Sequence, residues 1–147
     1  MSDSTIPLGK SVDEIQIGDK ASFRKTITET DVALEACQTG DFNPLHMDEE
    51  YAKTTRFGGR IAHGTVALGL LGPVMGMKLP GMGTILLGIN VRYLAPVMIG
   101  DTVTAEAEVV EKDTEKNVIG MKVRFFNQNG VDVIAGEASC KPPRKKK

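Results

Sequence analysis

Asp41 and His46 are the residues of this 147-residue chain whose types and spacing most readily suggest chemistry. They lie in the segment 40–64, which contains both histidines of the protein. An aspartate and a histidine held close together can bind one water molecule, because the carboxylate accepts its proton while the imidazole handles a second proton. The pair therefore predicts a catalyst that adds water to a substrate or removes it.

The segment between the two residues contains Asn43 and Pro44, and a proline disfavours a continuous helix at this point. We therefore expect both side chains to lie on a turn or loop. Residues 48–54 follow as a short helix, because acidic residues open the segment and Lys53 closes it. The alternative interpretation is an ordinary loop in which backbone groups satisfy both side chains.

A long apolar segment, residues 60–78, comes next and is predicted to be the longest helix. It is apolar on all sides, which is typical of a helix enclosed by other elements. Pro73 should kink or end it, and the segment is too short for a membrane span. Four glycines, each costing up to about 1 kcal/mol in an isolated helix, suggest close approach of a sheet or a ligand: Gly64, Gly69, Gly72 and Gly76.

Most of the remaining chain alternates between apolar and polar residues, as half-buried strands do. A helix capped by Thr30 or Asp31 is predicted to run to Cys37, and Asn129-Gly130 predicts a tight turn. Together these elements predict an α+β fold, with a curled antiparallel sheet wrapped around the long helix in one domain over residues 1–147. The tails 1–12 and 141–147 are expected to be flexible. The predicted strands are residues 20–28, 84–95, 102–111, 118–127 and 131–140.

The composition excludes several classes of function. A net charge of −1 and the absence of tryptophan argue against nucleic-acid binding, and no secretory signal opens the chain. We therefore expect a cytoplasmic protein with no nucleic-acid or membrane partner. Cys37 and Cys140 are too few for a disulfide framework. No dinucleotide motif, P-loop or metal-ligand spacing follows a strand, so we expect no cofactor and no metal.

Three segments of the chain closely resemble the MaoC-like (R)-specific enoyl-CoA hydratases and 3-hydroxyacyl dehydratases. These are DFNPLHMDEEYA, FGGRIAHGTVALGLLG and LPGMGTILLGINVRYLAPVMIGDTVTAEAEV. The resemblance implies a hot-dog fold and a homodimer that binds an acyl-CoA thioester near the subunit interface. It also implies reversible hydration of a trans-2-enoyl-CoA to the (R)-3-hydroxyacyl-CoA, by syn addition of water.

Residue by residue, the resemblance assigns Asp41 and His46 to the catalytic pair that activates the water. Gly64 matches the glycine whose backbone N–H receives the thioester carbonyl. Its place in the first turn of the long helix supports that role, because free N–H groups there favour a developing negative charge. Asn43 is expected to fix the loop, and His63 to support it as a hydrogen-bonded residue. Some members carry a serine where this chain has Gly69, so no hydroxyl contact is expected there.

Basic residues near the site are candidates for binding the phosphates of CoA, since these offer charge-assisted partners to arginine and lysine. The candidates are Arg60, Lys141 and Arg144. Three alternatives stay open on the same scaffold: a 3-hydroxyacyl dehydratase acting on acyl-carrier-protein thioesters, a non-catalytic acyl-thioester-binding subunit, and a thioesterase. The intact pair Asp41 and His46 favours a hydratase.

Overall fold

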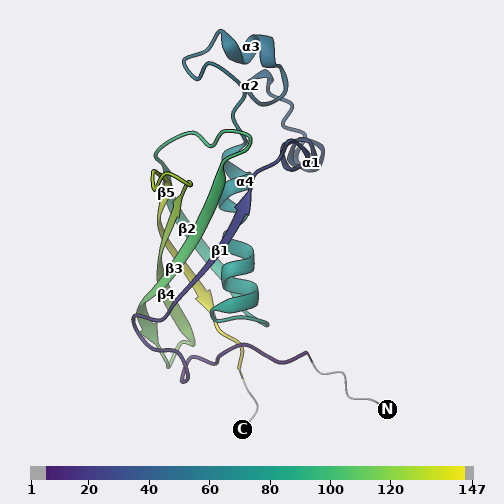
Figure 1. Cartoon of the computed structure of the whole chain (residues 1–147). Helices are drawn as coiled ribbons and strands as arrows, with labels where there is room; N and C mark the ends of the chain where they lie inside the picture. The colour runs from purple at the N-terminus through teal and green to yellow at the C-terminus, as the bar shows by residue number, and fades with distance from the viewer. Residues whose placement is uncertain (1–5, 145–147) are drawn as a thin grey trace, which may run out of the picture.

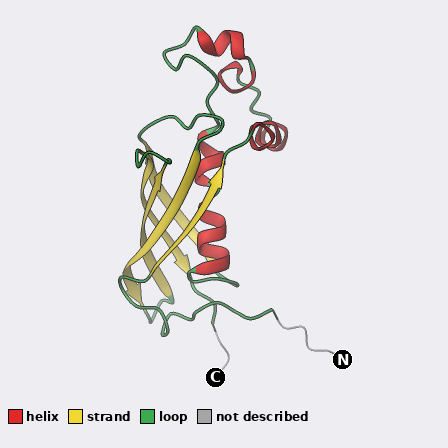
Figure 2. Cartoon of the chain, viewed as in Figure 1, coloured by secondary structure: helices red, strands yellow, loops and turns green. Residues whose placement is uncertain are grey.

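The computed structural model of the chain describes residues 6–144. Five strands form one antiparallel sheet in the order β1-β3-β4-β5-β2. A broken helix lies along one face of the sheet, and the shorter helices gather beyond one end of it (Figures 1 and 2). The strands are β1 (Lys20–Thr26), β2 (Ile85–Tyr93), β3 (Thr102–Asp113), β4 (Val118–Phe126) and β5 (Asp132–Lys141).

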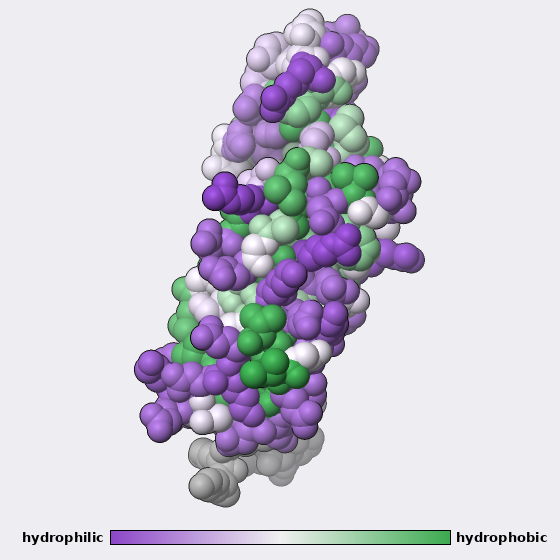
Figure 3. Space-filling view, turned by 90° about the vertical axis from the view of Figure 1, so that its left-hand side faces the viewer, coloured by the Kyte–Doolittle hydropathy of each residue, from purple (hydrophilic) through white to green (hydrophobic). Residues whose placement is uncertain are grey.

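The core lies between the sheet and this helix, and the middle strands follow the predicted alternation closely. Every second side chain from Val103 to Val109 of β3 and from Ile119 to Phe125 of β4 is fully buried, as expected for strands with one face against a core. The outer face of these strands is charged, with pairs such as Lys20 and Glu108, whose Nζ and Oε2 atoms are 3.1 Å apart. The face on the left of Figure 1 is accordingly mostly hydrophilic (Figure 3). The buried residues are Val103, Ala105, Ala107, Val109, Ile119, Met121, Val123 and Phe125.

The central helix, residues 64–78, is built from three segments: α4 (Gly64–Leu68), α5 (Leu71–Pro73) and the π-helical turn η1 (Val74–Lys78). The prediction that it begins at Arg60 was wrong by four residues. Ile61 bridges to Met98 and the Ala62 N–H donates to the Val97 carbonyl at 2.8 Å, so this stretch is extended. The π-helical turn follows Pro73 directly, consistent with the predicted kink at that residue.

The prediction that the central helix is enclosed on all sides was wrong for the single chain. Gly69 and Gly72 are exposed, and this side of the helix borders an apolar groove of about 450 Å³ whose other wall includes Leu86 and Ile89 of β2. Strand β2 lies at the edge of the sheet, and it exposes the apolar side chains of Ile85, Leu86, Leu87 and Ile89 to solvent. Its predicted alternation is also interrupted by a bulge between Leu86 and Gly88.

Helix α1 (Glu29–Thr39) begins earlier than predicted, because its cap is Thr28 and neither Thr30 nor Asp31. The Thr28 hydroxyl accepts from the Asp31 N–H, and the Asp31 carboxylate accepts from the Thr28 N–H in return. This reciprocal pair is a capping box with aspartate in the position usually held by glutamate or glutamine. The helix ends at Gly40, whose φ of 80° is the left-handed conformation common at helix ends.

The described parts of both tails are packed against the domain, which differs from the prediction of flexible ends. Gly9 and Lys10 donate backbone hydrogen bonds to residues 80–82, and the Asn117 amide donates to the Pro142 carbonyl at 2.9 Å. The remainder of the predicted tails, residues 1–5 and 145–147, lies outside the described residues. Among residues 6–144, no helix is long and apolar enough to cross a membrane.

Candidate active site

Residues 40–63, here called the site lobe, carry the predicted catalytic pair beyond the end of the sheet. After Asp41 the chain forms α2 (Pro44–Met47) and α3 (Glu49–Lys53). His46 therefore lies on a four-residue helix and not on a loop, because Pro44 occupies the first helical position, where it needs no N–H partner. The side-chain carbonyl oxygen of Asn43 caps this helix by accepting a hydrogen bond from the Leu45 N–H at 3.0 Å.

The lobe brings Asp41, His46 and His63 together. The two imidazole rings stack with their centroids 4.0 Å apart and are tilted by 32°. The nearest carboxylate oxygen of Asp41 lies 4.0 Å from His63 Nε2. His46 is 9% exposed and His63 is 2% exposed, whereas half of the Asp41 side chain is exposed. An exposed carboxylate therefore lies beside two buried imidazoles.

Backbone carbonyls fix the tautomers of both histidines. His46 Nδ1 lies 2.8 Å from the Ile61 carbonyl and His63 Nε2 lies 2.9 Å from the Asp41 carbonyl. A carbonyl can only accept, so we assign the hydrogen of each neutral ring to that nitrogen. His46 is thereby left with an accepting Nε2. His63 holds the backbone that carries Asp41, and its Nδ1 is buried without a partner among the described residues.

Gly64 is the first residue of α4, with His63 as its N-cap. A side chain there would collide with Tyr93, because a Cβ atom built on Gly64 would lie 2.5 Å from Tyr93 Cε1. The Tyr93 ring thus packs against Gly64 on the side where a Cβ atom would lie. Thr65 follows, and its hydroxyl donates to Glu35 of α1 at 2.5 Å.

These groups surround a cavity of about 440 Å³, a size common for small-ligand sites. Asp41, His46, His63 and Gly64 all line it, so the structure places four of the predicted site residues in one cavity. The cavity wall also contains Arg56 and Tyr93, which sequence reasoning missed. Arg56 immediately precedes the motif FGGRIAHG, one of the segments that carry the family resemblance. Tyr93 was interpreted only as an apolar position of a predicted strand.

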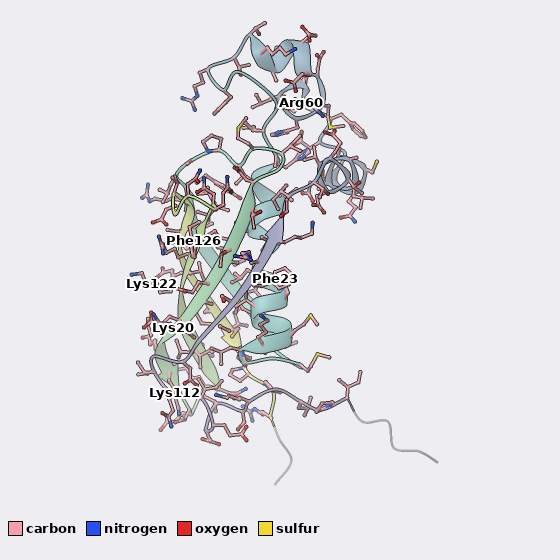
Figure 4. The ribbon with its side chains drawn as sticks, viewed as in Figure 1. Lys20, Phe23, Arg60, Lys112, Lys122 and Phe126 are labelled. Atoms are coloured by element: carbon pink, nitrogen blue, oxygen red, sulfur yellow. The ribbon has the colours of Figure 1, made fainter. Side chains whose placement is uncertain are left out.

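The three predicted CoA-binding residues lie outside this cavity. Arg60 points within the lobe: its guanidinium donates to both carboxylate oxygens of Glu29, at 2.7 and 2.8 Å, and to Glu49 at 3.1 Å. Figure 4 shows Arg60 between the lobe and α1. Lys141 pairs with Ile85, at the opposite end of β2 from Tyr93. At about 3.3 Å per residue, roughly 25 Å of strand separates Lys141 from the cavity, and Arg144 follows Lys141.

Asp41, His46 and His63 also have the composition of a metal site, with ligand atoms within 4.8 Å of one another. Two histidines and one carboxylate can bind Fe²⁺ or Zn²⁺. However, His63 Nε2, the nitrogen that lies 4.0 Å from the Asp41 carboxylate, already meets a backbone carbonyl. A metal ligand must present a lone pair instead of a hydrogen. The hydrogen bonding of His63 therefore suits proton chemistry better than metal binding.

Comparison with known proteins identifies the family. The model of the MaoC like domain matches residues 13–128. The chain belongs to the MaoC-like family. It is 38% identical to an (R)-specific enoyl-CoA hydratase of Aeromonas caviae over 133 residues, covering 90% of this chain and 99% of that protein. It is 37% identical to a 3-hydroxybutyryl-CoA dehydratase of Methylorubrum extorquens, covering 90% and 84%.

The fold of this MaoC-like chain is that of the family's hydratases. The structure of the unliganded R-hydratase PhaJ1 from Pseudomonas aeruginosa superimposes with a TM-score of 0.88 at 42% identity. The match covers 93% of this chain and 88% of that one. The predicted hot-dog fold, a curled antiparallel sheet around a central helix, is therefore confirmed, although one side of that helix is open in the single chain.

Proposed function

We propose that this MaoC-like protein is an (R)-specific enoyl-CoA hydratase, a hydro-lyase that reversibly adds water to trans-2-enoyl-CoA thioesters. The observation that carries the proposal is that Asp41, His46 and Gly64 line one cavity. A water-activating pair and a donor for an enolate oxygen are the two requirements of hydration next to a thioester. Similarity to relatives named as hydratases supports the same conclusion.

We assign each of these groups a step in the proposed reaction. The Asp41 carboxylate takes a proton from the bound water as its oxygen attacks C3, and His46 Nε2 accepts a hydrogen bond that orients this water. The electrons of the double bond move toward the thioester carbonyl, whose oxygen becomes an enolate stabilised by the Gly64 N–H. A proton from the pair then returns to C2. Because one pair supplies both the hydroxyl and the proton from one side, the addition is syn.

One assay separates the proposed reaction from a thioesterase and from a non-catalytic binding subunit. The protein is incubated with crotonyl-CoA, and loss of the enoyl absorbance is followed together with free thiol. Hydration removes the enoyl absorbance without releasing thiol. Release of thiol would show a thioesterase, and no change in either signal would favour a non-catalytic acyl-thioester-binding subunit. Activity that survives EDTA would agree with a site that uses no metal.

We also propose that the protein is a homodimer formed along β2. This edge strand exposes Leu86, Leu87 and Ile89, and the open side of the central helix lies across the groove from it. A second copy on this surface would cover a long edge strand, which proteins seldom leave free. Such an interface should bury roughly 1,600 Å² or more. Sedimentation as a monomer at micromolar concentration would contradict the proposal. A cytoplasmic location stays a prediction.

A further inference from the structure

Two arginines of the site lobe lie four positions apart and have different surroundings. Arg60 is enclosed by the carboxylates of Glu29 and Glu49. Arg56 is exposed, and within residues 6–144 it makes no ion pair with a carboxylate. It is also the only lysine or arginine among the described residues that line the cavity of Asp41. One arginine therefore holds the lobe together, and the other is available to a ligand.

The turn that carries Arg56 is fixed by its own hydrogen bonds. The Thr55 hydroxyl donates to the Ala52 carbonyl at 2.7 Å and accepts from the Phe57 N–H at 3.3 Å. The Gly58 N–H donates to the Thr55 carbonyl at 3.1 Å. The Arg56 guanidinium carbon lies 4.9 Å from the centroid of the half-buried Phe57 ring, within cation–π range. The guanidinium is thus partly ordered before a ligand binds, which lowers the entropic cost of binding.

The cavity limits which part of an acyl-CoA can meet this guanidinium. A volume of about 440 Å³ accommodates the thioester and the adjoining part of the pantetheine arm, while the nucleotide must extend beyond it. The arm offers amide carbonyl oxygens, and arginine offers five N–H donors and no acceptor. We propose that Arg56 donates to an amide carbonyl of the pantetheine arm and so holds the thioester against Gly64. The inference rests on the proposed function and adds a residue that binds the uncharged pantetheine arm.

Binding of saturated thioesters tests this role independently of turnover. Butyryl-CoA and S-butyryl-pantetheine have no double bond to hydrate, and only the first carries the nucleotide and its phosphates. Their Kd values are measured by calorimetry for the wild-type protein and for Arg56→Gln. Arg24→Gln is the matched control, because Arg24 is an exposed arginine of β1 that does not line this cavity.

We expect Arg56→Gln to raise the Kd values of both thioesters by a similar factor of about tenfold, which is the scale of a hydrogen bond to a charged group. The factor should be the same at low and high salt, and Arg24→Gln should change neither Kd. Weakening of butyryl-CoA alone, with a salt-dependent factor, would overturn the proposal and place the cation against phosphates. Unchanged Kd values for both ligands would overturn it as well. Hydration of crotonyl-CoA by the wild-type protein is scored separately, so failure of the proposed function is recognised as such.

Discussion

In the middle of the sheet, β3 and β4 bury a continuous row of apolar side chains, whereas the site lobe buries very few. The buried side chains of the lobe are two alanines and two histidines, and Phe42 and Tyr51 remain at least half exposed. Polar, directional contacts hold the lobe instead: the Asn43 cap, the carbonyl partners of the histidines and the ion pairs of Arg60. The core thus supplies most of the stability, while the lobe supplies chemistry with little burial energy of its own. Mutations should separate the two properties.

The largest expected effect is on turnover, from substitutions in the lobe that keep shape and change proton chemistry. Asp41→Asn and His46→Gln should each lower kcat on crotonyl-CoA by about 10²- to 10⁴-fold, the usual contribution of general acid–base groups. Substrate binding should change far less, because these groups act mainly in the transition state. Steady-state kinetics and urea unfolding of the same samples give both quantities. Near-normal kcat in both folded variants would make the pair structural and favour an acyl-thioester-binding role.

The next effect is on stability, from the core. Phe125 is completely buried, and Phe125→Ala should lower the free energy of unfolding by about 3–5 kcal/mol through lost burial and a cavity. Denaturant titration at fixed protein concentration measures this change, since an oligomer's stability depends on concentration. At a temperature where the variant is folded, kcat should stay within a few fold of wild type. A loss of turnover as large as that of Asp41→Asn would mean that core and lobe are not separable.

How well the sequence predicted each region follows from the same difference. The alternation of β3 and β4 reports burial directly, because both strands are central and their partners lie within the chain. The apolar pattern of β2 and of the central helix predicted a closed helix, but the single chain leaves one side of that helix open. Sequence periodicity shows that a face is apolar, but it does not identify what covers that face.

The lobe was predicted through its motif, and only in part. The residue types and the family resemblance identified Asp41, His46, His63 and Gly64. The helical turn at His46 was missed because proline was taken only as a helix breaker, although it is well suited to a first helical position. Arg60 was assigned to substrate phosphates as a basic residue near the site. Its ion-pair partner Glu29 lies 31 positions away in the chain. Contacts across such distances cannot be read from local spacing.

A third and smaller effect tests why residue 64 is glycine. Gly64→Ala should lower kcat by roughly 10²-fold if the added methyl displaces the thioester carbonyl from the N–H, a loss comparable to removing an oxyanion donor. Tyr93 offers the competing explanation, because its ring would lie 2.5 Å from that methyl. The double variant Gly64→Ala, Tyr93→Ala has room for the methyl. We expect kcat to remain low in the double variant, and recovery to wild-type turnover would show that only packing against Tyr93 requires the glycine.

The ion pair between Arg60 and Glu29 should contribute less to the free energy of unfolding, on the order of 1 kcal/mol, because 61% of the Glu29 side chain is exposed to solvent. The hydrogen bonds from Arg60 lower the pKa of Glu29 below its ordinary value of 4.5. A lowered carboxylate pKa stabilises the folded protein above pH 4.5, and this contribution is lost as the pH falls through the folded-state pKa. The Arg60→Gln variant should therefore have a lower free energy of unfolding than the wild-type protein at pH 7, and this difference should disappear in acid. A constant difference in stability from pH 7 to pH 3 would contradict this account.

The smallest effect concerns the two thiols and leaves function unchanged. Cys37 is exposed on α1 beside the lobe, whereas Cys140 is fully buried in β5. Burial raises the pKa of the Cys140 thiol to about 12 from an ordinary value of 9.0, so almost no thiolate forms there at pH 8. Iodoacetamide should modify Cys37 quickly and Cys140 only as fast as the core opens, and Cys37→Ser assigns the two phases by mass spectrometry. Equal rates for both thiols in the native protein would mean that the end of β5 exposes its thiol as readily as the surface of α1 does, which would contradict a rigid core at this strand.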